Sequence, residues 1–116
     1  MPKNHFAYLE LPTKDVAKLK RFYGGLFGWT HEDFGPGYAA VHGSGLEAGY
    51  NGTPGGRSAA PLAMIETDDI DAMEHEVRAA GGTITVSTFV YPGGRRFHFR
   101  DPAGNELAVM QPDTLN

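Results

Sequence analysis

The chain has 116 residues, enough for one hydrophobic core, so we expect a single domain. Its formal net charge of −4 offers no basic stripe for phosphates, which excludes nucleic acid as an expected partner. The absence of cysteine excludes disulfides, thiolate zinc sites and cysteine nucleophiles, and it fits a reducing compartment. No apolar run approaches the roughly 18 residues of a membrane span, and the start lacks a signal-peptide pattern, so we expect a cytoplasmic protein without membrane contact.

The first half of the sequence predicts one strand, one helix and three further strands. Residues 5–11 alternate between two faces, as strands do, and Thr13 or Asp15 is suited to cap the helix that follows. Apolar residues recur at helical spacing from Val16, and Gly28 is expected to end the helix. Short runs separated by glycine-rich turns then predict a meander of strands over residues 29–34, 37–42 and 46–50.

The second half repeats this order. After a Gly- and Pro-rich linker over residues 51–60, a strand is expected at residues 62–66, and Asp69 marks the start of a helix that Gly81 and Gly82 end. The remaining expected strands cover residues 83–91, 96–100 and 106–110.

The repetition predicts the fold class. Each half has the order β-α-β-β-β, so we expect an α+β domain spanning residues 1–116, with paired modules at residues 4–50 and 61–112. One helix covers one face of each four-stranded sheet, which leaves the other face bare. We therefore expect the two bare faces to enclose a cleft between curved mixed sheets.

The faces opposite the helices carry the candidate site. Strand alternation turns one set of side chains toward the expected cleft: Phe6, Tyr8, Glu10, Leu62, Met64, Arg96, His98, Ala108 and Met110, with Glu47 if its strand keeps register. An apolar and aromatic lining with a few polar groups is typical of a small-molecule pocket.

Glu10 is the most informative of these residues. A carboxylate in a partly apolar cleft must be hydrogen-bonded, paired with a cation, or raised in pKa. Arg96 and His98 on the opposite module are its candidate partners. Two interpretations stay open: a structural bridge between the modules, or a catalytic role in which Glu10 or His98 is a general base.

A set of short motifs resembles a known family. The motifs are Glu10-Leu11-Pro12 followed by Asp15, Phe22-Tyr23, Leu26-Phe27-Gly28-Trp29, Gly81-Gly82 and Asp101-Pro102-Ala103-Gly104-Asn105. In this order they resemble the two modules of the glyoxalase/bleomycin-resistance/extradiol-dioxygenase superfamily, also called vicinal oxygen chelate proteins. The resemblance implies metal-dependent isomerisation or ring cleavage, thiol transfer to an epoxide, or sequestration of a drug, and it suggests a homodimer. Fold alone does not choose among these activities.

The resemblance also implies where a metal would be bound. The positions equivalent to the four ligands of metal-dependent members hold Tyr8, Glu47, Leu62 and Ala108. Leucine and alanine have no donor atom, so we expect no metal and no cofactor at the family position. His5 lies nearby, but by alternation it shares a face with Ala7 and is expected to be structural unless a bulge changes the register.

Two functions therefore stay open. The first is a metal-free binding protein that holds an aromatic or amphipathic small molecule through the predicted lining. The alternative is an enzyme of the same superfamily, with metal-dependent or acid/base lyase, isomerase or dioxygenase chemistry. The sequence leaves open whether the protein is an enzyme.

Overall fold

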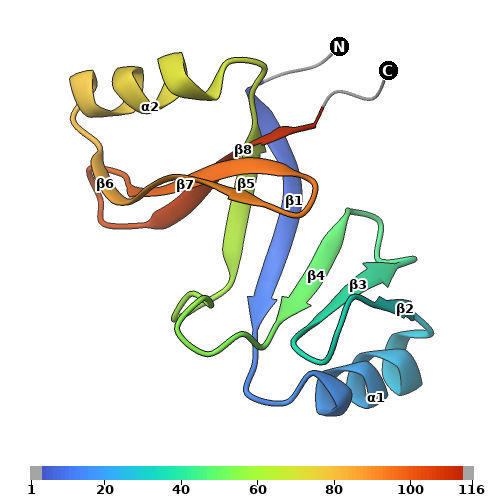
Figure 1. Ribbon diagram of the computed structural model, residues 1–116. Coiled ribbons are helices and arrows are strands. Elements are labelled where there is room, and N and C mark those ends of the chain that lie inside the picture. Colours follow the sequence, from blue (N-terminus) through green and yellow to red (C-terminus); the bar gives the residue numbers. More distant parts are fainter. Residues whose placement is uncertain (1–3, 114–116) are drawn as a thin grey trace. The chain divides into compact units, whose positions relative to one another are not determined.

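The structure, a computed structural model, describes residues 4–113. These residues divide into two compact units: a first unit, Ala7–Leu62, and a second unit that joins the chain before Ala7 to the chain after Leu62. Each half has the order β-α-β-β-β (Figure 1), which confirms the α+β class, whereas the module bounds stay a prediction. Within residues 4–113 no helix is long and apolar enough to cross a membrane.

The first unit contains one helix and a four-stranded sheet. Its elements are β1 (His5–Pro12), whose first two residues belong to the second unit, α1 (Val16–Phe27), β2 (Thr30–Asp33), β3 (Tyr38–His42) and β4 (Ala48–Asn51). The strand order is β2-β3-β4-β1. Strand β4 runs parallel to β1 and antiparallel to β3, so the chain must cross over through α1 before it returns to the side of β1.

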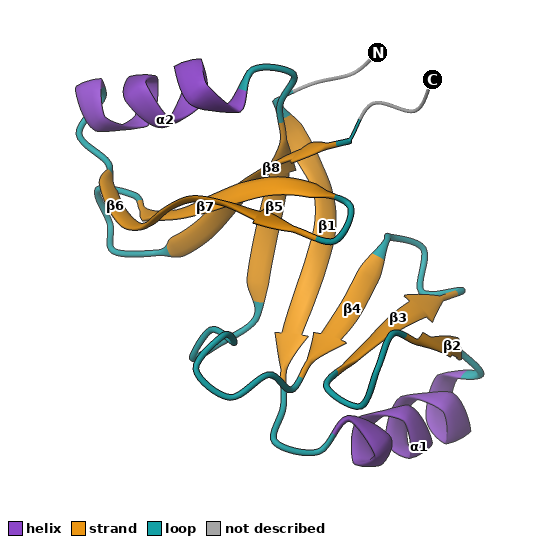
Figure 2. Ribbon diagram, viewed as in Figure 1, coloured by secondary structure: helices purple, strands orange, loops and turns teal. Residues whose placement is uncertain are grey.

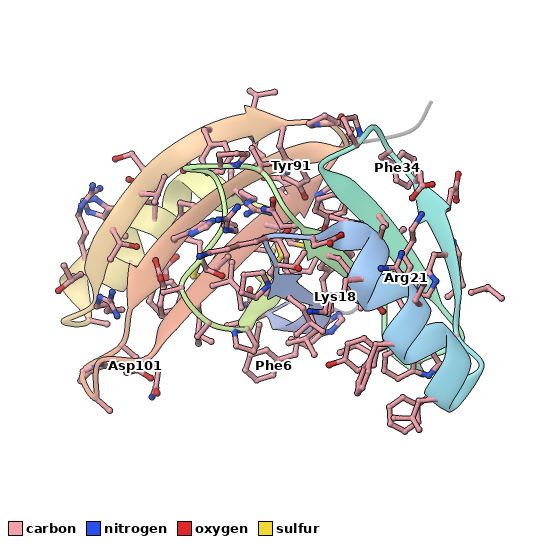
Figure 3. The ribbon with its side chains drawn as sticks, turned by 90° about the horizontal axis from the view of Figure 1, so that it is seen from below. Phe6, Lys18, Arg21, Phe34, Tyr91 and Asp101 are labelled. Atoms are coloured by element: carbon pink, nitrogen blue, oxygen red, sulfur yellow. The ribbon has the colours of Figure 1, made fainter. Side chains whose placement is uncertain are left out.

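Helix α1 begins and ends where the sequence predicts. The Asp15 side chain accepts a hydrogen bond from the backbone N–H of Lys18 at 3.1 Å, which caps the first turn. Gly28 has a φ of 77°, the left-handed conformation that ends many helices and that glycine adopts without strain. Lys18 and Arg21 are exposed on this helix (Figure 3).

One face of this sheet packs against α1. The buried cluster consists of Val16, Ala39, Val41, Ala48 and Tyr50, with Leu9, Leu11, Leu19, Tyr23 and Trp29 packed against it. Trp29 stacks on Tyr23 with 5.2 Å between ring centroids. Trp29 is therefore a residue of the helix-side core, as its position after the helix predicts.

The second unit repeats the arrangement. Its elements are β5 (Leu62–Glu66), whose first residue belongs to the first unit, α2 (Ile70–Ala79), β6 (Thr83–Tyr91), β7 (Gly94–Arg100) and β8 (Glu106–Pro112). Its strand order is β5-β8-β7-β6. Asp69 caps α2 by accepting from the N–H of Ala72, and Gly81 follows with a φ of 101°. The core beneath α2 is formed by Ile70, Phe97, Phe99 and Val109, with Ile65, Met73, Val77, Ile84 and Leu107 packed against it.

The turn between β7 and β8 is held by one aspartate. Oδ1 of Asp101 accepts from the backbone N–H groups of Ala103 and Asn105, both at 2.9 Å. The Asn105 side chain and these N–H donors lower the pKa of Asp101 because they favour its charged form. Gly104 has a φ of 93°, and Figure 3 shows Asp101 at this corner. The predicted hairpin is confirmed.

Several strand boundaries differ from the prediction by one or two residues, as where β7 begins at Gly94 and β8 ends at Pro112. Two of the differences bear on the site. Strand β1 includes Pro12, which was expected to end it, because Pro12 still pairs with Asn51 of β4. Strand β4 covers Ala48–Asn51 rather than residues 46–50, so Glu47 precedes the strand and Asn51 lies within it instead of in the linker. The rest of the expected linker is a loop without helix or strand (Figure 2).

Candidate functional site

The open face of the first unit lies opposite α1. Leu9 and Leu11 of β1 pack into the helix-side core, so Tyr8 and Glu10, which alternate with them, point to the other face. This confirms the predicted facing of both residues. Glu10 is only 1% exposed, so its carboxylate depends on the groups around it.

Three side chains, those of Tyr8, Tyr38 and Asn51, form a hydrogen-bond network with this carboxylate. We call these four residues, Glu10 included, the Glu10 cluster. Oε2 of Glu10 accepts from the Tyr38 hydroxyl at 3.0 Å, and Oε1 accepts from Nδ2 of Asn51 at 3.1 Å. The hydroxyls of Tyr8 and Tyr38 lie 2.6 Å apart. The cluster joins a buried carboxylate to two phenols and an amide.

The direction of each hydrogen bond in this cluster follows from its neighbours. Oδ1 of Asn51 accepts from the backbone N–H of Thr53 at 2.9 Å, so the other amide atom, facing Glu10, is the donor. An ionised Glu10 only accepts, so Tyr38 uses its single hydroxyl proton toward it. The bond between the phenols must then run from Tyr8 to Tyr38. The hydrogen bonds therefore all run in one direction: Tyr8 donates to Tyr38, and Tyr38 donates to Glu10. We call this donor-to-acceptor direction the polarity of the cluster.

The surroundings favour this polarity. Burial, followed by the charge of Glu10 and the proximity of Tyr8, raises the pKa of Tyr38 well above its usual value, so Tyr38 keeps its proton. Gly49 pairs with Glu10 across the strands, and a Cβ added there would overlap both phenol oxygens. Only glycine leaves room for the two hydroxyls to meet at this point.

A hollow of about 330 Å³ adjoins the cluster. It is lined by Tyr8, Ala40, Val41, His42, Gly43, Gly45, Leu46, Glu47 and Ala48, all from the first unit. Tyr8 is the member of the Glu10 cluster that lines it. This volume lies within the range of about 300–1,000 Å³ typical of small-molecule pockets.

The open face of the second unit carries a different cluster, which we call the Arg96 cluster: Phe89, Tyr91, Arg96, His98 and Glu106. The Arg96 guanidinium lies 5.5 Å from the ring centroid of Phe89 and 5.4 Å from that of Tyr91. Cation–π attraction therefore holds this charge on two aromatic rings. Arg96 and His98 are both buried, and they point away from α2, as alternation with Phe97 predicts.

His98 has a defined tautomer in this arrangement. Nε of Arg96 donates to Nε2 of His98 at 3.2 Å, and a guanidinium cannot accept, so Nε2 carries no proton. The ring proton is then on Nδ1, which lies 3.8 Å from Oε2 of Glu106. Because its basic nitrogen already accepts a hydrogen bond, the geometry favours a structural role for His98. General-base catalysis by His98 stays a prediction.

The other predicted lining residues have varied surroundings. Leu62 and Met64 are fully buried, Met110 is half-buried, and Phe6 is 59% exposed. Strand pairing places Met110 beside Arg96, and Met64 beside Ala108, which also pairs with His98. Pairing thus brings Met64, Arg96, His98 and Met110 onto one face of the second unit. In the first unit, Tyr8 and Glu47 line the same hollow, and Tyr8 is joined to Glu10 through Tyr38.

Sequence reasoning missed two members of the Glu10 cluster, Tyr38 and Asn51. The sequence predicts a strand at Tyr38 and a linker at Asn51, and it marks neither residue as part of a site. Alternation along β3 would have placed Tyr38 on the open face, opposite Ala39 and Val41 of the core. No local signal pointed to Asn51, because its role depends on where β4 ends. The expected bridge from Glu10 to Arg96 or His98 stays a prediction.

Comparisons with known proteins agree with this architecture. The model of the Glyoxalase/Bleomycin resistance protein/Dioxygenase superfamily matches residues 4–109. The chain belongs to this superfamily. A superfamily member from Vibrio splendidus 12B01 has a similar solved structure, with a TM-score of 0.67 at 15% identity over 90% of this chain and 96% of that one. At that identity the likeness shows the fold alone.

Curated proteins are similar to this chain in sequence as well. The anthracycline biosynthesis protein DnrV of Streptomyces peucetius is 34% identical over 94% of this chain and 47% of its own length. CFP32 of Mycobacterium tuberculosis is 30% identical over 90% of this chain and 44% of its own length. The chain thus spans about half the length of these curated relatives.

The four positions that the resemblance assigns to metal ligands do not fit a divalent ion. Leu62 and Ala108 have no nitrogen or oxygen donor in their side chains, and such ions take about four donors. Tyr8 is engaged with Tyr38, and Glu47 is exposed. Within residues 4–113, no group of three or more His, Cys, Asp or Glu could hold a metal. Loss of the family metal site stays a prediction.

His5, the other metal-ligand candidate, is exposed. Its Nδ1 lies 3.0 Å from the carbonyl oxygen of Phe6, and it belongs to the second unit. Its structural role, and any metal binding with Glu47, remain untested predictions.

Proposed function

We propose that this superfamily member binds a small aromatic or amphipathic molecule without a metal ion. One observation carries the proposal: Tyr8, joined through Tyr38 to the buried carboxylate of Glu10, lines an open hollow of about 330 Å³. Pockets of this kind combine apolar walls with a few placed polar groups. Ala40 and Leu46 supply the apolar part here.

The relatives support the same ligand class. The name of the Streptomyces peucetius relative places that protein in the biosynthesis of anthracyclines, which are aromatic compounds. The absence of donors at Leu62 and Ala108 supports binding without a metal. Self-association into a homodimer and a cytoplasmic location remain predictions.

Calorimetric titration with 2-naphthol tests this proposal. Trp29 packs on the helix side of the sheet, so heat is a better readout than its fluorescence. We expect saturable binding that EDTA does not change. Ala40→Leu adds bulk to a wall of the hollow and should weaken binding at least tenfold, whereas the same exchange at the exposed Ala79 should leave it unchanged.

Three results would contradict the proposal: no heat of binding, equal binding by the Ala40→Leu variant, or loss of binding with EDTA. Elemental analysis of the purified protein adds an independent check. A stoichiometric divalent metal would favour the metal-dependent enzyme instead.

A second function is favoured by the chain of hydrogen bonds itself. A buried carboxylate at the end of two phenols is able to receive a proton, which is the first requirement of acid/base catalysis. Lyase or isomerase chemistry through Glu10 is therefore the alternative. If Glu10→Gln abolishes turnover of a bound ligand but keeps its binding, the protein is an enzyme rather than a binding protein only.

A further inference from the structure

The polarity of the Glu10 cluster restricts which ligands the hollow can recognise. We infer that Tyr8 is a hydrogen-bond acceptor toward the ligand, so the protein selects aromatic molecules that carry a hydroxyl or amine donor. This rests on the proposed function and adds the chemical class of the ligand's polar group. Tyr8 is the contacting residue, and Tyr38, Glu10 and Asn51 are positioning residues.

A backbone N–H group fixes the orientation of the Asn51 side chain. The N–H of Thr53 donates to Oδ1 of Asn51, and this direction cannot be reversed because a backbone N–H only donates. Asn51 must therefore turn Nδ2 toward Oε1 of Glu10. An amide donor on one oxygen and a phenol donor on the other favour the ionised carboxylate.

The hydrogen bond to Glu10 fixes the direction of the hydrogen bond between the two phenols. Tyr38 gives its proton to Oε2 of Glu10, so its oxygen is left to accept from Tyr8. A phenol has one proton and two acceptor sites, so a Tyr8 that donates to Tyr38 can meet a further polar group only as an acceptor. The distance of 2.6 Å between the phenol oxygens is that of a well-formed O–H···O bond.

The charge near the hollow acts in the same direction. Glu47 lines the hollow and places a carboxylate there. This carboxylate favours a ligand that is neutral or positively charged and opposes one that is an anion. An aromatic hydroxyl or amine has a donor and no negative charge, whereas a carboxylate is an anion without a donor.

A matched pair of ligands tests the inference: 2-naphthol, which has a donor hydroxyl, and 2-methoxynaphthalene, which has only an acceptor oxygen. In the wild-type protein we expect 2-naphthol to bind about three- to tenfold more tightly, the ratio that one neutral hydrogen bond gives. Equal affinity for both would overturn the inference and leave the proposed function standing. Binding of neither would overturn both.

Two variants test whether Tyr8 is a hydrogen-bond acceptor toward the ligand or has only a structural role. Tyr8→Phe should lower the affinity for 2-naphthol to that for the methyl ether. Tyr38→Phe leaves the Tyr8 hydroxyl able to turn and donate, so the preference should disappear because the ether gains affinity. A preference that persists in Tyr38→Phe would overturn the inference even if Tyr8→Phe does not fold.

Tyr50→Phe is the matched control. It deletes one buried tyrosine hydroxyl from the same sheet, but on the helix side, where that hydroxyl meets His31 at 3.0 Å. The preference for 2-naphthol should be unchanged in this variant. A preference lost in Tyr50→Phe as readily as in Tyr38→Phe would mean that it reflects general packing rather than the polarity of the cluster.

Discussion

The two units have the same architecture and the same helix-side packing, but their open faces carry opposite chemistry. In the first unit the open face is organised around a carboxylate that phenols and an amide stabilise. In the second it is organised around a guanidinium held between aromatic rings and bonded to His98. The helix-side face has to bury apolar surface in both units, whereas the open face is free to diverge.

The helix-side cores should be the most sensitive to substitution. Phe97 is fully buried beneath α2, so Phe97→Ala should lower the free energy of unfolding by about 3–5 kcal/mol. Phe89 lies in the Arg96 cluster and is 37% exposed, so Phe89→Ala should cost about 1–2 kcal/mol. Urea unfolding measures both. Similar losses at the two positions would contradict the assignment of stability to the helix-side face.

Gly49→Ala should disturb the open face of the first unit specifically. The added methyl group overlaps both phenol oxygens, so we expect a loss of about 1–3 kcal/mol in unfolding free energy and loss of the preference for 2-naphthol. Gly25→Ala is the control, because a Cβ there meets nothing within 4 Å and alanine favours the helix. A Gly49→Ala protein with unchanged stability and unchanged preference would show that the phenols need no such space.

The smallest expected effects are on the pH dependence of stability. Burial, and then the charge of Lys20, lower the pKa of His31 below its usual 6.5, so the folded state favours the neutral ring. The neutral His31 ring contributes its full stabilisation above pH 6.5. This stabilisation is lost as the pH falls through the pKa that His31 has in the folded state, which is lower. Thermal unfolding of His31→Gln should show a flatter dependence just below pH 6.5. An unchanged slope would contradict this.

The stability of the second unit should depend on pH in a more acidic range. Hydrogen bonds from Thr88 lower the pKa of Glu74 below 4.5, so this carboxylate stabilises the fold above that pH and ceases to do so as the pH falls through its folded value. The Thr88 hydroxyl also bonds this carboxylate directly. Thr88→Val should flatten the dependence below pH 4.5 and leave the range near pH 6 unchanged.

Much of the fold could be predicted because its signals are local. Asp15 and Asp69 cap helices with their own side chains, Gly28 ends one helix, and Asp101 closes a turn with neighbouring N–H groups. Each of these interactions spans only a few residues. The boundary errors at Pro12 and at Asn51 fall where a neighbouring strand decides how far the pairing extends.

The candidate site could be predicted only in part. The facing of Tyr8 and Glu10 followed from alternation, since successive side chains of a strand point to opposite faces. The partners of Glu10 did not follow, because Tyr38 lies 28 residues away in sequence and Asn51 lies 41 away. Which of the polar residues meets Glu10 depends on register, and register is set by packing across the whole sheet.

The sequence by itself determined the repeated β-α-β-β-β order, the two faces of each strand and the set of polar groups available to a site. Only the tertiary structure decided that Glu10 meets Tyr38 and Asn51, that Gly49 leaves room for two phenols, and hence which way the protons point. Strand alternation and helix caps are local properties of the chain. The polarity of a hydrogen-bond network depends on atoms brought together from distant strands.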